Sequence, residues 1–73
     1  MTKFRFRLAE LRAEEGVPLK DLAAAIGYSV TCCSYWEIGK TVPSIEAAVK
    51  VAQHYNVSLD YLAGLTDERR PPV

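Results

Sequence analysis

Cysteine is scarce in this sequence, and its placement excludes two kinds of chemistry. Cys32 and Cys33 are adjacent, and no other cysteine occurs. A structural metal site needs ligands separated by two or more residues and a second pair elsewhere in the chain. A disulfide between neighbours would be strained, and a reducing compartment disfavours it. Consecutive helical side chains point about 100° apart. We therefore expect both to be small packing residues, with at most one facing the core.

Long apolar runs and an excess of either charge are also absent. No run approaches the roughly 20 residues of a membrane span, and the charged N-terminus is unlike a signal peptide. We therefore expect a cytoplasmic protein with no membrane partner. Nine basic residues balance nine acidic ones, which is unfavourable for nucleic-acid binding unless the charges are unevenly distributed over the surface. A chain of 73 residues allows one domain with one modest core.

Catalytic and cofactor-binding patterns are missing as well. The single histidine, His54, has no partner motif. The sequence shows no paired histidine and carboxylate, no nucleophile beside a base and no glycine-rich phosphate loop. These absences predict no enzyme activity, no cofactor, no metal site and no small-molecule ligand.

The sequence does contain helical periodicity, with no strand pattern. Apolar residues recur at spacings of three and four, and glycines and capping residues divide the pattern at short intervals. We predict five short helices: residues 4–15, 19–26, 30–37, a fourth from the Ser44 cap to Asn56, and a fifth from the Ser58 cap to Gly64. They would form a compact all-α bundle in residues 1–65, followed by a flexible C-terminal tail at residues 66–73.

The second and third helices are joined by a short turn through Gly27, as in a helix-turn-helix, whose second helix enters the major groove of DNA. The matching residues are Leu11-Arg12, Gly16, Leu22-Ala23, Gly27 and Ser29, Trp36-Glu37, Gly39-Lys40, Pro43-Ser44 and the run from Val57 to Leu62. With them the sequence resembles the lambda-repressor-like, Cro-type helix-turn-helix family, also called the XRE family, over about residues 7–68. The resemblance implies a small phage- or mobile-element-type transcription regulator that binds a double-stranded DNA operator, with homodimerisation possible.

The resemblance also implies structural roles. Relatives pair the arginine at the position of Arg12 with the glutamate at the position of Glu37, which would tie the first helix to the end of the third. Trp36 is expected to pack rather than to stack on a base, and Cys33 falls where relatives place a core residue. Phe4 and Phe6 are too close in sequence to share one helical face, so one of them is expected to be exposed or to fold over the core.

Candidate DNA contacts lie on or beside the third helix. They are Lys20, Val30, Thr31, Ser34, Tyr35, Lys40 and Thr41. Thr31, Ser34 and Tyr35 would face bases, and Val30 could meet a thymine methyl group. Lys20, Lys40 and Thr41 would hold phosphates.

An alternative comes from apolar residues where relatives usually carry polar ones. These are Leu19, Val30, Tyr35 and Ile38. An exposed apolar group with an aromatic member and few charges is typical of a protein interface. The alternative is therefore a modulator or antirepressor that uses this group, with Ser34, to bind another repressor protein and alter its DNA occupancy. The sequence leaves both hypotheses open, and control of transcription is common to them.

Overall fold

The predicted all-α fold is confirmed by the computed structural model, which describes residues 3–71 and contains helices but no strand in that range. The helices are α1 (Phe4–Glu15), α2 (Leu19–Ile26), α3 (Val30–Glu37), α4 (Ile45–Tyr55) and α5 (Leu59–Ala63). Their bounds agree with those expected from capping residues and periodicity. Within the same range no helix is long and apolar enough to cross a membrane.

Local caps set the starts of three helices. The hydroxyl groups of Ser29, Ser44 and Ser58 each accept a hydrogen bond from the backbone N–H three residues later, at 3.0, 3.1 and 2.9 Å. Each bond satisfies a donor that the first helical turn would leave without a partner. A serine at these positions therefore starts α3, α4 and α5 where the sequence places it.

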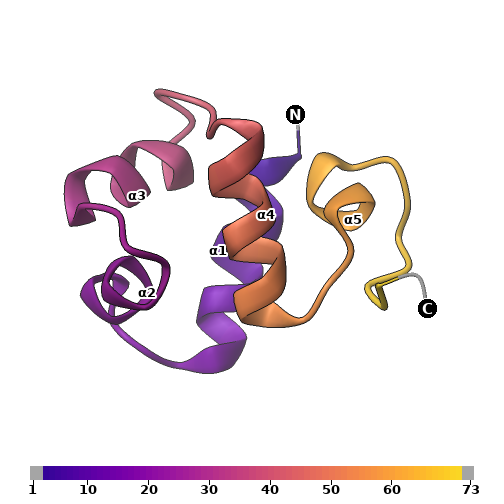
Figure 1. The fold of residues 1–73 in the computed structure, drawn as a ribbon, viewed down its shortest axis with the longest axis horizontal. Helices are drawn as coiled ribbons and strands as arrows, with labels where there is room; N and C mark the ends of the chain where they lie inside the picture. Colours follow the sequence, from indigo (N-terminus) through magenta and orange to yellow (C-terminus); the bar gives the residue numbers. More distant parts are fainter. Residues whose placement is uncertain (1–2, 72–73) are drawn as a thin grey trace.

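The helices surround one core to which every helix contributes. In Figure 1, α2 and α3 lie on one side of α1 and α4, and α5 lies on the other. The largest fully buried side chains are Phe4, Leu8, Leu22, Cys33, Val51 and Leu62. No helix can therefore be removed without opening this core.

Trp36 fixes α3 to the rest of the bundle. Its side chain is only 3% exposed, which confirms the expectation that it packs. The ring of Phe4 meets it edge to face with centroids 6.2 Å apart, and the ring of Tyr28 lies 5.3 Å away. Phe4 is thus the buried member of the N-terminal pair, whereas Phe6 is 60% exposed. Cys33 is buried and Cys32 half-buried, and burial raises the pKa of the Cys33 thiol.

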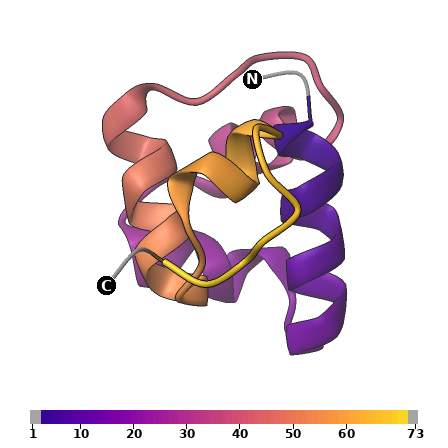
Figure 2. The same ribbon diagram turned by 90° about the vertical axis from the view of Figure 1, so that its right-hand side faces the viewer.

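Residues 66–71, part of the predicted flexible tail, run back across α5 and α1 (Figure 2). The backbone N–H of Ser58 donates to the carbonyl of Arg69 at 2.7 Å. The guanidinium of Arg69 donates to Glu10 at 2.6 Å and to Glu14 at 2.7 and 2.8 Å. These contacts join residues up to 59 positions apart, and helical periodicity does not reveal them. Residues 72–73 lie outside the described residues, and flexibility of the segment stays a prediction.

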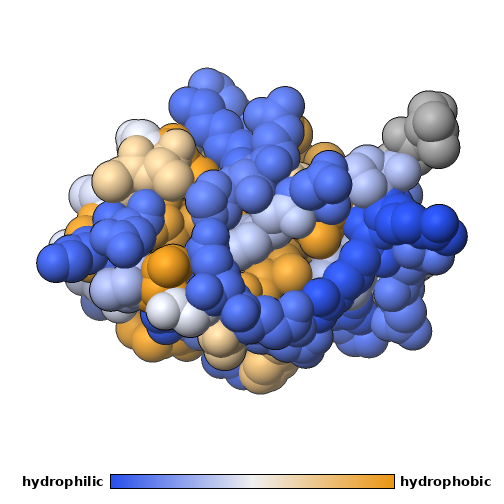
Figure 3. Space-filling view, turned by 90° about the horizontal axis from the view of Figure 1, so that it is seen from below, coloured by the Kyte–Doolittle hydropathy of each residue, from blue (hydrophilic) through white to orange (hydrophobic). Residues whose placement is uncertain are grey.

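Charged groups gather on the side of the molecule where this segment lies. Arg7 donates to Asp67 at 2.8 Å, and its guanidinium carbon lies 4.1 Å from the centre of the Tyr61 ring. Figure 3 shows the lower face, which is mostly hydrophilic on the side of α5 and the C-terminal segment and exposes more apolar surface on the side of α2.

Replacing Trp36 with alanine should lower the free energy of unfolding by about 3–5 kcal/mol, because the substitution leaves a cavity between α1 and α3. Urea denaturation followed by circular dichroism measures this loss. Phe6→Ala is the matched control, since an exposed aromatic side chain should change stability by no more than about 0.5 kcal/mol. Equal losses in the two variants would show that Trp36 does not hold α3.

Replacing Arg69 with glutamine should change the acid sensitivity of the fold. Hydrogen bonds from Arg69 lower the pKa of Glu14. The ion pair of these two residues therefore contributes to stability above the ordinary pKa of Glu14, and this contribution is lost as pH falls through the lowered pKa. Wild type should therefore melt at a higher temperature than Arg69→Gln at about pH 7, and the two should converge at about pH 2. Arg70→Gln, which removes the same charge from an exposed site, should show little difference at either pH. A gap between wild type and Arg69→Gln that does not change with pH would contradict this electrostatic role.

Candidate nucleic-acid interface

The connection between α2 and α3 is a tight turn that depends on Gly27. This residue has φ 78°, and its N–H donates to the carbonyl of Ala23 at 2.9 Å. A side chain at such a φ would be strained, so glycine is suited to this position. Ser29 then begins α3. The turn thereby sets α3 across α2 in a helix-turn-helix.

The candidate DNA contacts lie along α3 and on its flanks. Val30 and Thr31 are exposed at the start of α3, and Lys40 and Thr41 are exposed just beyond its end. Ser34 and Tyr35 are half-buried between them, and Lys20 is exposed in the first turn of α2. The fold thus brings these polar, aromatic and cationic groups together around one helix. Their contacts with DNA stay a prediction.

Tyr35 and Lys40 form a contact at the C-terminal end of α3. The ammonium group of Lys40 lies 4.4 Å from the centre of the Tyr35 ring. The backbone N–H of Lys40 also donates to the carbonyl of Tyr35 at 2.9 Å. Because the ring face attracts the cation, the charge of Lys40 is held beside the end of the helix.

The apolar residues of the alternative hypothesis do not form one continuous exposed patch. Leu19 is partly buried and packs against the core, and Lys40 lies over the ring of Tyr35. Val30 and Ile38 are 46% and 61% exposed, but they lie at opposite ends of α3, about 12 Å apart along its axis at 1.5 Å per residue. The exposed apolar area is therefore smaller than the sequence pattern suggests.

Arg12 and Glu37 form a bidentate ion pair that joins α1 to the end of α3. Arg12 Nε and Nη2 donate to the two carboxylate oxygens of Glu37 at 2.6 and 2.9 Å, and Nη1 donates to the carbonyl of Val17 at 3.2 Å. The hydrogen bonds with Glu37 raise the pKa of Arg12. The paired side chains are 29% and 13% exposed, so water screens them less than a surface pair.

Arg5 also reaches the end of α3, and the sequence did not single it out. Its Nη1 donates to the carbonyl of Ile38 at 3.3 Å. Gly39 has φ 78°, and a Cβ placed there would lie 2.7 Å from the same nitrogen, so glycine makes room for the guanidinium. Arg5 lies two turns before Arg12 on the same face of α1, the face toward α3. The seven-residue spacing from Arg12 indicates that Arg5 lies on the face of α1 toward α3. It does not indicate that Arg5 bonds to a residue 33 positions away.

Ion pairing divides the basic side chains into two groups. Four arginines form ion pairs with carboxylates: Arg7, Arg12, Arg69 and Arg70. Within residues 3–71 the basic side chains without an ion pair to a carboxylate are Lys3, Arg5, Lys20, Lys40 and Lys50. Arg5, Lys20 and Lys40 lie on or beside the helix-turn-helix, with the carboxylate of Asp21 on α2. A chain without net charge therefore keeps unpaired cations around α3.

No group of three or more histidine, cysteine, aspartate or glutamate side chains within the described range could hold a metal ion. His54 lies 3.1 Å from the carboxylate of Glu15, at the ends of α4 and α1 and away from the candidate contacts on α3.

Comparison with known proteins places the chain in a family. The helix-turn-helix family matches residues 8–62, which include all five helices apart from the ends of α1 and α5. The chain therefore belongs to the helix-turn-helix proteins of the Cro and lambda-repressor type, as its motifs predicted. No solved structure matches it significantly.

Similar proteins include several with regulatory names. An uncharacterized HTH-type transcriptional regulator, YobD of Bacillus subtilis, is 34% identical over 67 residues, which cover 92% of this chain and 60% of YobD. The HTH-type transcriptional regulator DdrOP3 of Deinococcus deserti is 43% identical over 81% of this chain and 46% of its own length. The cryptic phage CTXphi transcriptional repressor RstR of Vibrio cholerae is 34% identical over 93% of this chain and 62% of its own length. The chain thus spans between about half and three fifths of these relatives.

The Arg12–Glu37 pair should contribute measurably to stability. In a double-mutant cycle with Arg12→Ala and Glu37→Ala, we expect a coupling of about 1–3 kcal/mol, because each single variant leaves a partly buried charge without its partner. Urea denaturation of the four proteins measures it. The matched control is the cycle of Arg7 and Asp67, which should couple far less because Asp67 is 94% exposed and water screens it. Equal coupling in the two cycles would contradict a special role for Arg12 and Glu37.

Proposed function

We propose that this chain regulates transcription by binding double-stranded DNA, with α3 as the recognition helix in the major groove. The observation that carries the proposal is the set of unpaired cations around α3 in a chain without net charge. Phosphate neutralisation supplies most of the affinity of DNA-binding proteins, so cations are expected where the duplex lies. Membership of the helix-turn-helix family and the regulatory names of the relatives support the same function.

Each candidate contact has a distinct role in this proposal. Thr31, Ser34 and Tyr35 face base edges, and Val30 meets a thymine methyl group. Lys20, Lys40 and Thr41 hold the phosphates that flank the groove. Glu37 and Arg12 touch no DNA and keep α3 at the angle that the groove requires. The chain thus acts as a binding protein and not as an enzyme.

We further propose that two copies bind one operator. A single short recognition helix reads only a few base pairs, and helix-turn-helix dimers place two such helices about 34 Å apart in successive turns of the groove. The operator is then expected to contain two related half-sites at that spacing.

The antirepressor hypothesis receives less support. Only Val30 and Ile38 of its apolar group are large and well exposed, and they are separated along α3. The names of the relatives describe transcriptional regulators and a repressor. Binding to another repressor protein would appear in the gel-shift experiment as a shift that requires the second repressor.

Selection of bound duplexes from a random library, followed by gel-shift titration, tests the proposed function. Wild type should enrich one motif. Lys40→Ala should weaken binding to every sequence and flatten the salt dependence, since Lys40 meets a phosphate, whereas Ser34→Ala should relax preference at one base position. Arg70→Ala is the control for lost charge, because Arg70 lies on the side opposite α3.

Two results would contradict the proposal. One is a library with no sequence enriched at low salt. The other is a shift that appears only when a second repressor is present and that Val30→Asp abolishes, which would establish the antirepressor hypothesis instead.

A further inference from the structure

The end of α3 carries a second cation besides Lys40, and it comes from a distant part of the chain. Arg5 donates through Nη1 to the carbonyl of Ile38. The backbone of Gly39, the next residue, passes so close that a Cβ there would lie 2.9 Å from Arg5 Cδ. Lys40 and Thr41 follow directly and are exposed. Arg5 therefore belongs in space to the loop after the recognition helix.

Two contacts hold the guanidinium of Arg5 in place without neutralising it. One is the hydrogen bond to Ile38, and the other is the ring of Phe6, whose centre lies 4.4 Å from the guanidinium carbon. Neither partner is anionic, and no carboxylate within the described range forms an ion pair with Arg5. The contact also gives a reason for an aromatic residue at a position as exposed as Phe6.

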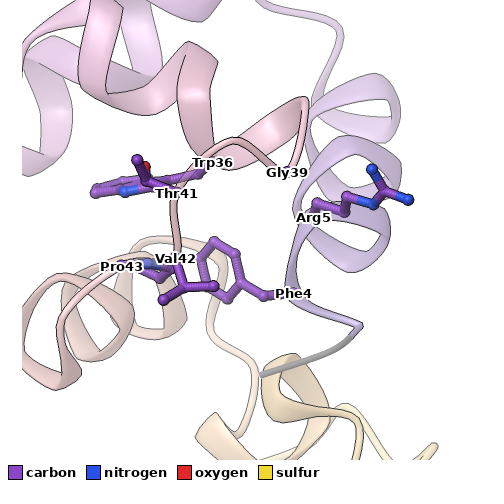
Figure 4. A pocket seen from close by; sticks show the side chains of 7 residues that line it. All are labelled: Phe4, Arg5, Trp36, Gly39, Thr41, Val42 and Pro43. Atoms are coloured by element: carbon purple, nitrogen blue, oxygen red, sulfur yellow. The ribbon is translucent and has the colours of Figure 1, made fainter.

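The guanidinium is directed to the surface and not into the neighbouring cavity. Phe4, Trp36, Val42 and Pro43 line this cavity together with Arg5, Gly39 and Thr41. In Figure 4 the side chain of Arg5 points away from the rings of Phe4 and Trp36. A planar, charged fork with N–H groups free for bonding matches the oxygens of a phosphate group.

We propose that Arg5 is a phosphate-binding residue that forms, with Lys40 and Thr41, a site for the DNA backbone at the C-terminal end of α3. This inference rests on the proposed function, because it requires that α3 lies in the groove. It adds a ligand from α1 to a contact that the sequence assigned to the loop alone. Gly39 is the residue that allows the guanidinium to reach the loop.

The test compares the affinity of wild type, Arg5→Gln and Arg5→Lys for a fluorescein-labelled, mixed-sequence duplex by fluorescence anisotropy. Glutamine keeps a polar N–H group but has no charge, whereas lysine keeps the charge. Loss of one phosphate contact should reduce the slope of log K against log salt by about 0.9, which makes binding roughly eight-fold weaker at about 0.1 M salt. We expect this loss for Arg5→Gln and a slope like that of wild type for Arg5→Lys.

Arg70→Gln is the matched control, because it removes the same charge from the far side of the molecule and should leave the slope unchanged. Circular dichroism checks that all variants fold. If wild type binds and Arg5→Gln binds with the same slope, the phosphate role of Arg5 is wrong while the proposed function stands. If Arg5→Gln and Arg70→Gln lose affinity equally, only net charge matters and the inference also fails. If wild type binds no duplex at low salt, both the proposed function and this inference are overturned.

Discussion

Helix α3 has eight residues, and its position depends on how it is held against α1. A helix of this length is not stable alone in water, so tertiary contacts must fix its direction. Trp36 packs against the rings of Phe4 and Tyr28, and the ion pair of Arg12 with Glu37 holds the helix end. The buried ring supplies apolar burial, and the bidentate ion pair adds a geometric constraint at the end of α3. The position of every candidate contact on α3 depends on the packing of Trp36 and on the ion pair of Arg12 with Glu37.

Ion pairs away from α3 explain how a chain with equal numbers of acidic and basic residues can present unpaired cations around α3. The C-terminal segment and α1 hold each other through Arg69 with Glu10 and Glu14 and through Asp67 with Arg7. These contacts place much of the acidic charge beside arginine on the side away from α3. Coulomb interactions between exposed charges are screened over about 8–10 Å at physiological salt. A phosphate beside α3 therefore experiences mainly the local cations, and the net charge of the chain is a poor guide to its partner.

Most of the fold could be predicted because its determinants are local. Serine caps and positive-φ glycines act within a few residues, so the start of α3 and the turn before it follow from Ser29 and Gly27. The pairing of Arg12 with Glu37 was expected only through the family resemblance, since nothing in the periodicity selects that partner. The role of Arg5 and the docking of Arg69 depend on contacts between distant segments and were missed. Leu19 was expected in an exposed apolar group, but it is partly buried against the core. Helical spacing does not show whether a residue at the edge of a core is buried.

The apolar residues on α3 are compatible with DNA recognition when affinity and specificity are considered separately. Phosphate contacts supply affinity without reading sequence, and the unpaired cations that flank α3 can provide them. In the proposed arrangement the residues left to read bases are Val30, Thr31, Ser34 and Tyr35, of which only the three with hydroxyl groups can form hydrogen bonds with base edges. Val30 suits the thymine methyl group better than the polar edge of a guanine. A recognition helix of this kind would make few hydrogen bonds to bases, so one copy alone would discriminate weakly between sequences. On the proposed function, discrimination would come from binding two half-sites together and from the shape of the DNA between them, and the composition of α3 supports the proposed dimer.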